Sequence, residues 1–314
     1  MNTQFAFSPF ILDYEHTIIG NSLLLNANCF QWMSQIEANS IHAIVTDPPY
    51  GVKEYEPDQL EKRTNGNGGV WRIPPSFDGN TRSPLPRFTA LSETERELVR
   101  QYFFDWAGLA LRVLKPGGHI ILASNTFLSQ IVFTAIADAG LEFRGQIVRL
   151  VRTLRGGDRP KNAEKIYPDV CTMPRGCYEP WGVFRKPLPP KMTVSECLKS
   201  YQTSGLRRKP DGNPFEDVID SQRTPRRERN IVNHPSLKPQ SFLRQVVYAS
   251  LPLGIGIVVD PFMGSGSTVA AAEAVGYTCI GVERMTNYYE MGVDAIPRLT
   301  ELTTLDQQLS FALV

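Results

Sequence analysis

The chain has 314 residues, of which 42% are hydrophobic and 21% are charged, and this composition is typical of a globular protein. No apolar run approaches the ~18 residues of a membrane span, which argues against a membrane protein, and the first residues lack the pattern of a secretory signal. The five cysteines are scattered and lack the paired spacing of a zinc site. We therefore expect free thiols, no metal site and a location in the cytoplasm.

The charges are unevenly distributed along the chain. From Arg144 to Lys238 there are 20 Lys and Arg residues against 10 Asp and Glu, whereas the remaining residues include 13 basic and 22 acidic ones. A basic segment on an otherwise acidic chain is typical of a surface that binds a polyanion such as nucleic acid. On charge alone, a solvated loop region fits this segment as well as a surface that binds a polyanion.

The length fits one large α/β domain with an inserted lobe as well as it fits two domains. Strand and helix patterns alternate, which predicts a mostly parallel sheet. Residues before about Phe10 show no pattern, and we expect them to be unstructured. Strands are predicted at His16–Ile19, Ile41–Thr46, His119–Ala123, Phe143–Val151, Trp181–Phe184, Ile255–Val259 and Tyr277–Glu283, and helices at Cys29–Ile36, Ser92–Leu114, Thr126–Ala139, Ser241–Ser250 and Val269–Val275.

The buried strand Ile41–Thr46 runs directly into Asp47-Pro48-Pro49-Tyr50. Two prolines cannot continue a strand, so the chain turns there and presents a carboxylate, backbone carbonyls and an aromatic ring. Ligands bind at the carboxyl ends of strands in open α/β sheets. The Asp47 carboxylate and the Pro48 carbonyl can accept both hydrogens of an exocyclic amino group on a nucleobase, while Tyr50 stacks on the base. A surface turn that merely ends a strand could also have these residues.

The middle of the chain contains two irregular segments. Residues 51–91 are rich in Gly, Pro, Asn and charge, which predicts a mobile flap over the candidate catalytic turn. Ser92 and Glu95 have the spacing of a capping box, which begins the helix that follows. From about Arg152 to Asn233 the alternation stops, and Pro, Gly, Arg and interleaved aromatic residues predict a basic lobe that faces DNA and contributes one core strand.

The last part of the chain has a strand ending at Asp260, a Gly264-Ser265-Gly266 turn, a helix, and a strand ending at Glu283. This is the order of a nucleotide-binding βαβ unit, in which the glycines admit a ligand close to the backbone and the acid accepts hydrogen bonds from a ribose. Such turns also occur only to pack a helix on a sheet. The missing third glycine predicts a ligand with a nucleoside and no pyrophosphate.

The two motifs, in this order, resemble those of the S-adenosylmethionine-dependent amino methyltransferases of DNA in their circularly permuted "beta" arrangement. Val45–Tyr50 is similar to the catalytic segment, Val259–Thr268 to the cofactor loop, and Asn233–Pro239 to the His-Pro-x-x-Lys-Pro segment before it. The resemblance covers roughly residues 16–298. It implies a Rossmann-like methyltransferase fold with a mostly parallel seven-stranded sheet, S-adenosylmethionine as cofactor and double-stranded DNA as substrate. A DNA substrate also implies that the protein is associated with the nucleoid when it is bound to DNA.

The resemblance also implies a division of the chain and a set of site residues. The division is a catalytic half (10–151) with the flexible loop 51–91, a target-recognition lobe (152–232) with a core strand near 181–185, a cofactor-binding half (233–300) and a C-terminal tail (301–314). The catalytic residues would be Asp47, Pro48, Pro49 and Tyr50. The cofactor would contact Asn28, Asp47, His234, Ser236, Lys238, Asp260, Phe262, Gly264, Gly266, Ser267, Thr268 and Glu283. In the basic lobe we expect DNA contacts from Arg155, Arg159, Lys161, Arg207, Arg208, Arg226 and Arg227.

Two positions depart from the family pattern. The family usually has Gly-Asp-Cys where this chain has Ala27-Asn28-Cys29, so an amide replaces a carboxylate that would contact the cofactor adenine. The family often has His-Glu near the position of Tyr178-Glu179, which leaves Glu179 without an assigned role. Pairing of Glu179 with an arginine is the alternative.

The predicted reaction is direct methyl transfer to the amino group of a flipped-out base. No cysteine follows a proline, as the nucleophile of a carbon-5 cytosine enzyme commonly does. Adenine N6 and cytosine N4 enzymes share the motifs above, and Asp in the first position of the catalytic segment favours adenine. An inactive DNA-binding protein of the same fold and an RNA methyltransferase are the alternatives from other classes. Members of this arrangement are often dimers, and a homodimer and a cognate restriction system remain open.

Overall fold

The computed structural model describes residues 3–54, 56–66, 68–73, 84–86, 88, 91–151, 157, 159–232, 234 and 236–304. Within these residues lies a nine-stranded sheet with the order β1-β2-β11-β10-β3-β6-β8-β7-β9, which has two strands more than the expected seven. Seven of the strands run in one direction, and β1 and β8 run antiparallel to their neighbours. The strands are β1 (Glu15–Ile19), β2 (Ser22–Asn26), β3 (Ile41–Thr46), β6 (Leu114–Ala123), β7 (Glu142–Leu150), β8 (Tyr178–Arg185), β9 (Val218–Asp220), β10 (Ile257–Asp260) and β11 (Thr278–Glu283).

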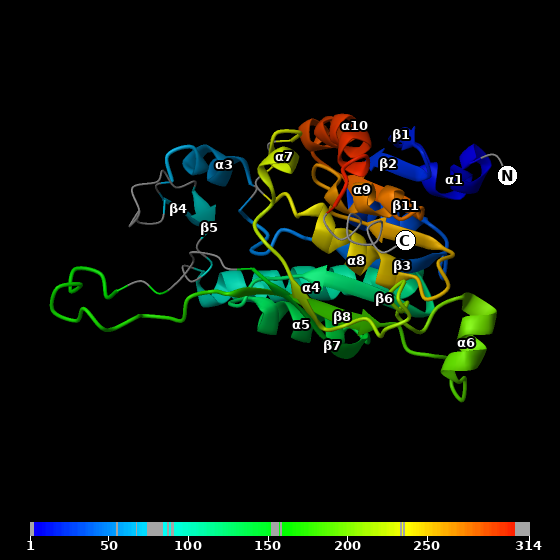
Figure 1. The fold of residues 1–314 in the computed structure, drawn as a ribbon, viewed down its shortest axis with the longest axis horizontal. Helices are drawn as coiled ribbons and strands as arrows, with labels where there is room; N and C mark the ends of the chain where they lie inside the picture. Colours follow the sequence, from blue (N-terminus) through cyan, green and yellow to red (C-terminus); the bar gives the residue numbers. More distant parts are fainter. Residues whose placement is uncertain are drawn as a thin grey trace.

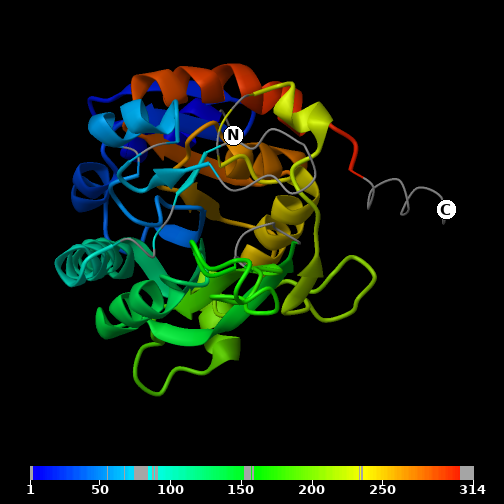
Figure 2. The same cartoon turned by 90° about the vertical axis from the view of Figure 1, so that its left-hand side faces the viewer.

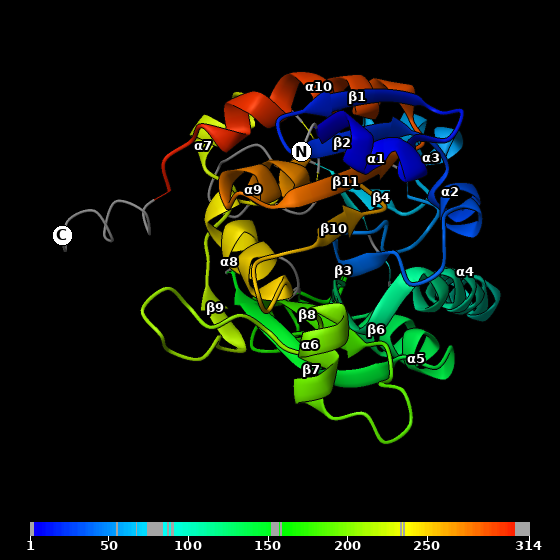
Figure 3. The same ribbon diagram turned by 90° about the vertical axis from the view of Figure 1, so that its right-hand side faces the viewer.

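Helices cover both faces of this sheet, as the view in Figure 3 shows. The first layer is α2 (Cys29–Gln35), α4 (Glu93–Val113) and α5 (Ser129–Asp138), and the second is α8 (Gln240–Ser250), α9 (Ser267–Ala274) and α10 (Thr286–Thr300). Along β3, Ile44 packs with the first layer and its neighbours Ala43 and Val45 pack with the second. The sheet is therefore buried on both faces, which confirms the expected α/β fold with a mostly parallel sheet.

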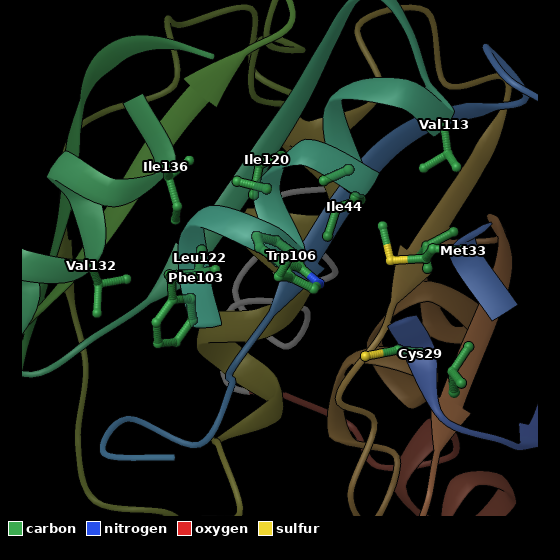
Figure 4. Close-up of a cluster of buried hydrophobic side chains, with 14 of the residues drawn as sticks. Cys29, Met33, Ile44, Phe103, Trp106, Val113, Ile120, Leu122, Val132 and Ile136 are labelled. Carbon is green, nitrogen blue, oxygen red and sulfur yellow. The ribbon is translucent and has the colours of Figure 1, made fainter. Parts of the chain in front are cut away.

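Helix α4 is at the centre of the first layer (Figure 4). Its Trp106 lies over Ile44 and Ile120 of the sheet, with Met33 of α2 to one side and Val132 of α5 to the other. The helix begins with the predicted capping box: Glu95 N donates to the Ser92 hydroxyl, and Ser92 N donates to the Glu95 carboxylate. Local sequence signals thus determined both where this helix starts and which face it buries.

The structure differs from expectation in the irregular segments. The N-terminal residues form helix α1 (Thr3–Ile11) because Phe7 and Phe10, three positions apart, bury their side chains in the core. The segment 51–91 contains α3 (Pro57–Arg63), which has proline at its first position, and the small sheet β4 (Trp71–Arg72) with β5 (Leu85–Pro86). The lobe 152–232 adds two strands to the main sheet, β8 and the short β9, instead of one.

Two projections lie beyond the carboxyl ends of the parallel strands. One consists of α3, β4 and β5, and the other consists of residues 159–177, the long green segment at the left of Figure 1. Both face the viewer in Figure 2. Helix α6 (Val194–Tyr201) lies at the opposite end, and the short α7 (Arg226–Arg229) lies near α10. None of the helices in the described part of the chain is long and apolar enough to cross a membrane.

Candidate active site

Four neighbouring strands end at one pocket. In the sheet order β2-β11-β10-β3, the residues at or just after the carboxyl ends of these strands are Asn28, Glu283, Phe262 and Asp47, and all four line the pocket. Strand β8 runs in the opposite direction, so its first residues lie at this same edge. The full lining consists of Ala27, Asn28, Cys29, Phe30, Asp47, Pro48, Pro49, Val52, Tyr102, His234, Ser236, Pro261, Phe262, Gly264, Val282, Glu283, Arg284, Met285 and Tyr288.

Glu283 is fixed at the pocket wall by backbone donors. Gly264 N and Met285 N donate to its two carboxylate oxygens over 2.9 and 2.8 Å. Burial raises the pKa of Glu283, and these two hydrogen bonds oppose the rise. Because a carboxylate has about four acceptor positions, the fixed group retains acceptors that a ligand hydroxyl can use.

Asn28 combines two roles at the end of β2. It is the N-cap of α2, and its side-chain oxygen accepts a hydrogen bond from Phe30 N over 2.9 Å. The cap uses the amide oxygen, so the amide nitrogen is the group that can donate to a ligand in the pocket. The chemistry at this position is therefore that of a hydrogen-bond donor, in contrast to the carboxylate that the family usually has.

The two glycines of the predicted cofactor loop have different surroundings. Gly264, with φ of +52°, lines the pocket, and a Cβ there would lie 3.2 Å from the His234 ring. Gly266, with φ of +83°, faces α10, where a Cβ would lie 2.4 Å from Ile296. Both need the left-handed conformation that glycine adopts readily, but only Gly264 opens space beside a ligand. The predicted catalytic and cofactor residues that are absent from the pocket lining are Tyr50, Lys238, Asp260, Gly266, Ser267 and Thr268.

Two of the predicted polar residues are fixed by protein contacts. The buried Asp260 accepts hydrogen bonds from the Thr46 hydroxyl (2.6 Å) and from Phe262 N (3.1 Å), which ties the end of β10 to β3. Burial raises its pKa to about 6. His234 accepts from Ser236 N at Nδ1, and burial, with Arg63 and Lys238 nearby, lowers the pKa of His234 to about 3. His234 is therefore a neutral ring in the pocket wall.

The candidate catalytic turn carries a buried network of charges. Tyr50 Oη lies 2.6 Å from Asp47 Oδ1 and 2.9 Å from Glu179 Oε1. Lys238 Nζ lies 2.5 Å from Asp47 Oδ2, 3.2 Å from Glu179 Oε1 and 3.3 Å from Tyr50 Oη. Lys238 therefore bridges both carboxylates from behind the pocket. The His-Pro-x-x-Lys-Pro segment and the Asp47–Tyr50 segment therefore contact each other through Lys238. Their order in the chain does not predict this contact.

Glu179 is the main site residue that the sequence did not assign. Its Oε2 accepts from Arg149 Nη1 (2.9 Å) and from Trp181 Nε1 (3.2 Å), and Arg149 is its cross-strand partner on β7. Arg149 is itself held by the Ser221 hydroxyl and the Gln222 carbonyl. The predicted arginine pairing is confirmed, and it is accompanied by direct contact with the catalytic turn.

The acids of this network differ in their proton affinity. Burial raises the pKa of Asp47, and Lys238 opposes this rise while Glu179 adds to it. Burial acts on Glu179 as well, but Lys238 and Arg149 outweigh it and lower the pKa of Glu179 to about 2. Burial and the two carboxylates raise the pKa of Tyr50 well above its usual value. At neutral pH, Glu179 is thus a carboxylate and Tyr50 a phenol.

The predicted DNA contacts do not lie on one surface. Arg159 and Lys161 are exposed on the projecting segment 159–177, and Arg226 and Arg227 are exposed on α7. Arg155 lies outside the described residues.

Arg207 and Arg208 lie at the far end of α8 from Lys238. Arg207 N donates to Ala249 O, and its guanidinium lies 4.4 Å from the centre of the Tyr248 ring. Arg207 Nη1 also donates to the Tyr277 hydroxyl over 2.8 Å. The structure does not bring these two arginines to the pocket edge, because charge composition carries no information about which end of the sheet a loop occupies.

Several lining residues were not predicted from the sequence. Phe30 and Tyr102 form an edge-to-face pair with ring centres 5.0 Å apart, and the Tyr102 ring centre lies 6.4 Å from that of Phe262. Met285 lies two residues after β11 and Tyr288 lies in the first turn of α10, so both could have been found as near neighbours of Glu283 in the sequence. Tyr102 comes from the middle of α4 and has no local signal.

Comparison with known proteins adds a family. Residues 41–294 match a family model described as DNA methylase. The Type II methyltransferase M.HindIII of Haemophilus influenzae is 22% identical over 296 residues, which cover 87% of this chain and 94% of that protein. The Type II methyltransferase M.BamHI of Bacillus amyloliquefaciens is 25% identical over 291 residues, covering 87% and 56%. The DNA adenine methyltransferase YhdJ of Escherichia coli is 44% identical over 61 residues, covering 19% and 20%.

Solved structures agree at the level of the fold. A DNA modification methylase from Thermus thermophilus, complexed with S-adenosyl-L-methionine, aligns with a TM-score of 0.52 at 17% identity, covering 88% of this chain and 95% of that one. The cytosine-N4-specific PvuII DNA methyltransferase aligns with a TM-score of 0.55 at 13% identity, covering 93% and 90%. At these identities the likeness establishes a shared fold.

Proposed function

Because the chain belongs to the DNA methylase family, we propose that it transfers a methyl group from S-adenosylmethionine to the exocyclic amino group of a base in duplex DNA, with adenine N6 as the favoured target. The observation that carries the proposal is the common pocket of Asp47 and Glu283 at the ends of β3 and β11. Asp47 suits an amino group and Glu283 suits a ribose, and both line the same pocket.

The pocket residues fit S-adenosylmethionine. Phe262 and Tyr102 provide apolar walls for an adenine ring, Glu283 provides acceptors for ribose hydroxyls, and Asp47 provides a negative charge that suits a sulfonium or an ammonium group. When bound, S-adenosylmethionine supplies the methyl group from its positively charged sulfur. Asn28 would hold the adenine from the start of α2.

The catalytic turn then acts by position and charge. The Asp47 carboxylate and the Pro48 carbonyl accept the two hydrogens of the target amino group and thereby increase the electron density on its nitrogen. Tyr50 stacks on a base that has left the duplex. The pKa of Asp47 is raised by burial, which favours its acceptance of the proton that the amine loses after methylation. Most of the rate increase therefore comes from alignment and electrostatics.

The choice of adenine depends on a small number of observations. Asp47 in the first position of the catalytic segment favours adenine, and the short match to an adenine methyltransferase supports it. The likeness to a cytosine-N4 enzyme is one of fold and leaves the mechanism the same. Cytosine N4 is therefore the alternative target. A homodimer and a cognate restriction system remain predictions.

The direct test is methylation of genomic DNA by the purified protein with labelled S-adenosylmethionine, followed by digestion to nucleosides and mass spectrometry. We expect N6-methyladenine from the wild type and a loss of at least about a hundredfold in Asp47→Ala, because that variant lacks the acceptor for the amine. A product of N4-methylcytosine would support the same mechanism with cytosine as the target base. Wild-type protein that labels neither nucleoside above the level of the variant would refute the proposal.

A further inference from the structure

The hydroxyl of Tyr50 has one proton and two carboxylate acceptors. Its oxygen lies 2.6 Å from Asp47 Oδ1 and 2.9 Å from Glu179 Oε1, and a phenol donates a single hydrogen bond. Only one of the two contacts can therefore carry the proton at a time. When the proton lies toward Asp47, Lys238 Nζ is the donor to Glu179 Oε1, 3.2 Å away. When the proton lies toward Glu179, none of these contacts gives Asp47 Oδ1 a donor, because Lys238 contacts Oδ2.

In this arrangement the protein itself uses both oxygens of Asp47. Oδ1 contacts the Tyr50 hydroxyl, and Oδ2 contacts Lys238 Nζ over 2.5 Å. The proposed reaction needs one of these oxygens to accept a hydrogen of the target amino group. The contact of Asp47 with Lys238 is an ion pair inside the protein, so the contact of Asp47 with the Tyr50 hydroxyl costs less free energy to break. The Tyr50 hydroxyl then needs another acceptor, because a buried donor without a partner is costly.

Glu179 is built to be that acceptor. Its second oxygen is held by Arg149 and Trp181, so its first oxygen stays directed at Tyr50. Arg149 is 5% exposed and is fixed on β7 opposite Glu179 on β8. With Arg149 and Lys238 balancing Asp47 and Glu179, the network contains two positive and two negative charges, which permits both carboxylates to stay ionised.

We propose that Glu179 is a positioning residue for methyl transfer, which takes over the hydrogen bond of the Tyr50 hydroxyl when the target amino group binds Asp47. This inference rests on the proposed function and goes beyond it, since it gives a role to a residue outside both motifs. Glu179 does not touch the reacting atoms. It frees Asp47 Oδ1 and keeps Tyr50 and Lys238 in place while the base enters.

A purely structural role would make a different prediction. Arg149 and Glu179 would then serve only to tie β7 to β8. The same two strands have a second cross-strand pair of this kind, in which Arg185 Nη2 lies 2.6 Å from Glu142 Oε2, at the end of the strands away from the pocket. Glu142→Gln is therefore a matched control for Glu179→Gln, because each variant replaces one carboxylate that pairs with an arginine across β7 and β8.

The experiment is a double-mutant cycle between Glu179→Gln and Tyr50→Phe. The variants are assayed for the methylation rate at saturating cofactor and DNA, for cofactor affinity and for thermal unfolding. We expect Glu179→Gln to lower kcat on the order of tenfold or more, with cofactor affinity within about threefold of wild type. In the Tyr50→Phe background there is no hydroxyl on Asp47 to relocate, so the same change should lower kcat by less than about threefold. Glu142→Gln should leave kcat within about twofold.

Two results would overturn the inference while leaving the proposed function intact: equal kcat in Glu179→Gln and Glu142→Gln, or the same fold loss from Glu179→Gln with and without the Tyr50 hydroxyl. Should Glu179→Gln fail to fold, Glu179→Asp keeps the charge beside Arg149 and shortens the reach to Tyr50. It should lose kcat to a similar degree, and wild-type kcat in this variant would count against the inference. Wild-type protein that methylates no DNA overturns the proposed function and this inference together.

Discussion

At the scale of single residues, Asn28 serves both the fold and the pocket, and substitutions can separate the two. Asn28→Ala removes the cap on Phe30 N, and we expect the free energy of unfolding to fall by about 1 kcal/mol. The same variant also removes the amide from the pocket, so cofactor affinity should fall on the order of tenfold. Denaturant unfolding and calorimetric titration with S-adenosylmethionine measure the two effects.

Asn28→Asp is the matched comparison. Aspartate caps a helix as well as asparagine does, so its unfolding free energy should stay within about 0.5 kcal/mol of wild type. It also restores the carboxylate that the family usually has, and we expect cofactor affinity within about fivefold of wild type. An alanine variant that binds the cofactor as tightly as the wild type would show that Asn28 only caps α2.

At the scale of elements, His42 joins β3 to β10. Ile257 N donates to His42 Nδ1 over 3.0 Å, which leaves the ring proton on Nε2, next to Lys115 Nζ. Burial, with a smaller effect from Lys115, lowers the pKa of His42 to about 4 from 6.5. The unfolded chain therefore binds a proton that the folded protein does not, and stability falls as the pH drops from 6.5 toward 4.

We expect His42 to account for about 2 kcal/mol of the stability that the protein loses between pH 7.5 and pH 5. His42→Asn retains an acceptor near Nδ1 for Ile257 N and has no group that titrates in this range. Urea unfolding at both pH values should show a smaller loss in this variant by that amount. His16→Asn, at an exposed histidine of β1, is the control substitution. Equal losses in wild type and His42→Asn would contradict the prediction.

Elements with strong local signals could be predicted from the sequence. Four of the six residues of β3 are apolar, and two prolines follow the strand after Asp47. Helix α4 has its capping box and its apolar face. Elements that depend on distant partners could not. Strand β9 has only three residues and exists because it pairs with β7, and β2 pairs with β11 across most of the chain.

The candidate site divides in the same way. Asp47, Gly264 and Glu283 lie next to strands in recognisable motifs, and the pocket contains all three. The contacts of Glu179 depend on the register of β7 and β8, which the sequence does not specify, because the intervening segment is long and irregular. Sequence reasoning could therefore name Glu179 and its arginine partner type, but it could not place either beside Tyr50.

At the scale of the whole molecule, the basic charges divide between two ends of the sheet. Arg159 and Lys161 are exposed on the segment that projects beyond the pocket edge, while Arg208 and Lys209 lie near the far end of α8. We expect replacement of Arg159 and Lys161 by alanine to weaken duplex binding and to reduce the slope of log affinity against log salt by about 2, since each phosphate contact contributes ~0.9.

The control variant removes one arginine and one lysine from the opposite end of the sheet. Alanine at Arg208 and Lys209 should leave the salt slope of duplex binding unchanged, because these side chains are distant from the pocket edge. Binding is measured by fluorescence anisotropy with a labelled duplex over a range of salt concentrations. Equal slopes for the two double variants would show that the segment 159–177 is not the phosphate-binding surface.

The antiparallel pairing of β7 with β8 has a consequence for how much the segment between the two strands could vary. The residues between the two strands leave and return at neighbouring points, where Val151 N donates to Cys177 O and Arg149 pairs with Glu179. The entropic free-energy cost of closing a loop between these points rises only slowly with loop length, by about 0.6 kcal/mol for each doubling. Segments of different length and sequence can therefore be grafted between Val151 and Cys177 without disturbing the sheet. The Arg149–Glu179 pair marks the boundary that such a graft must preserve. Under the proposed function, grafts in this segment are the expected route to new recognition sequences.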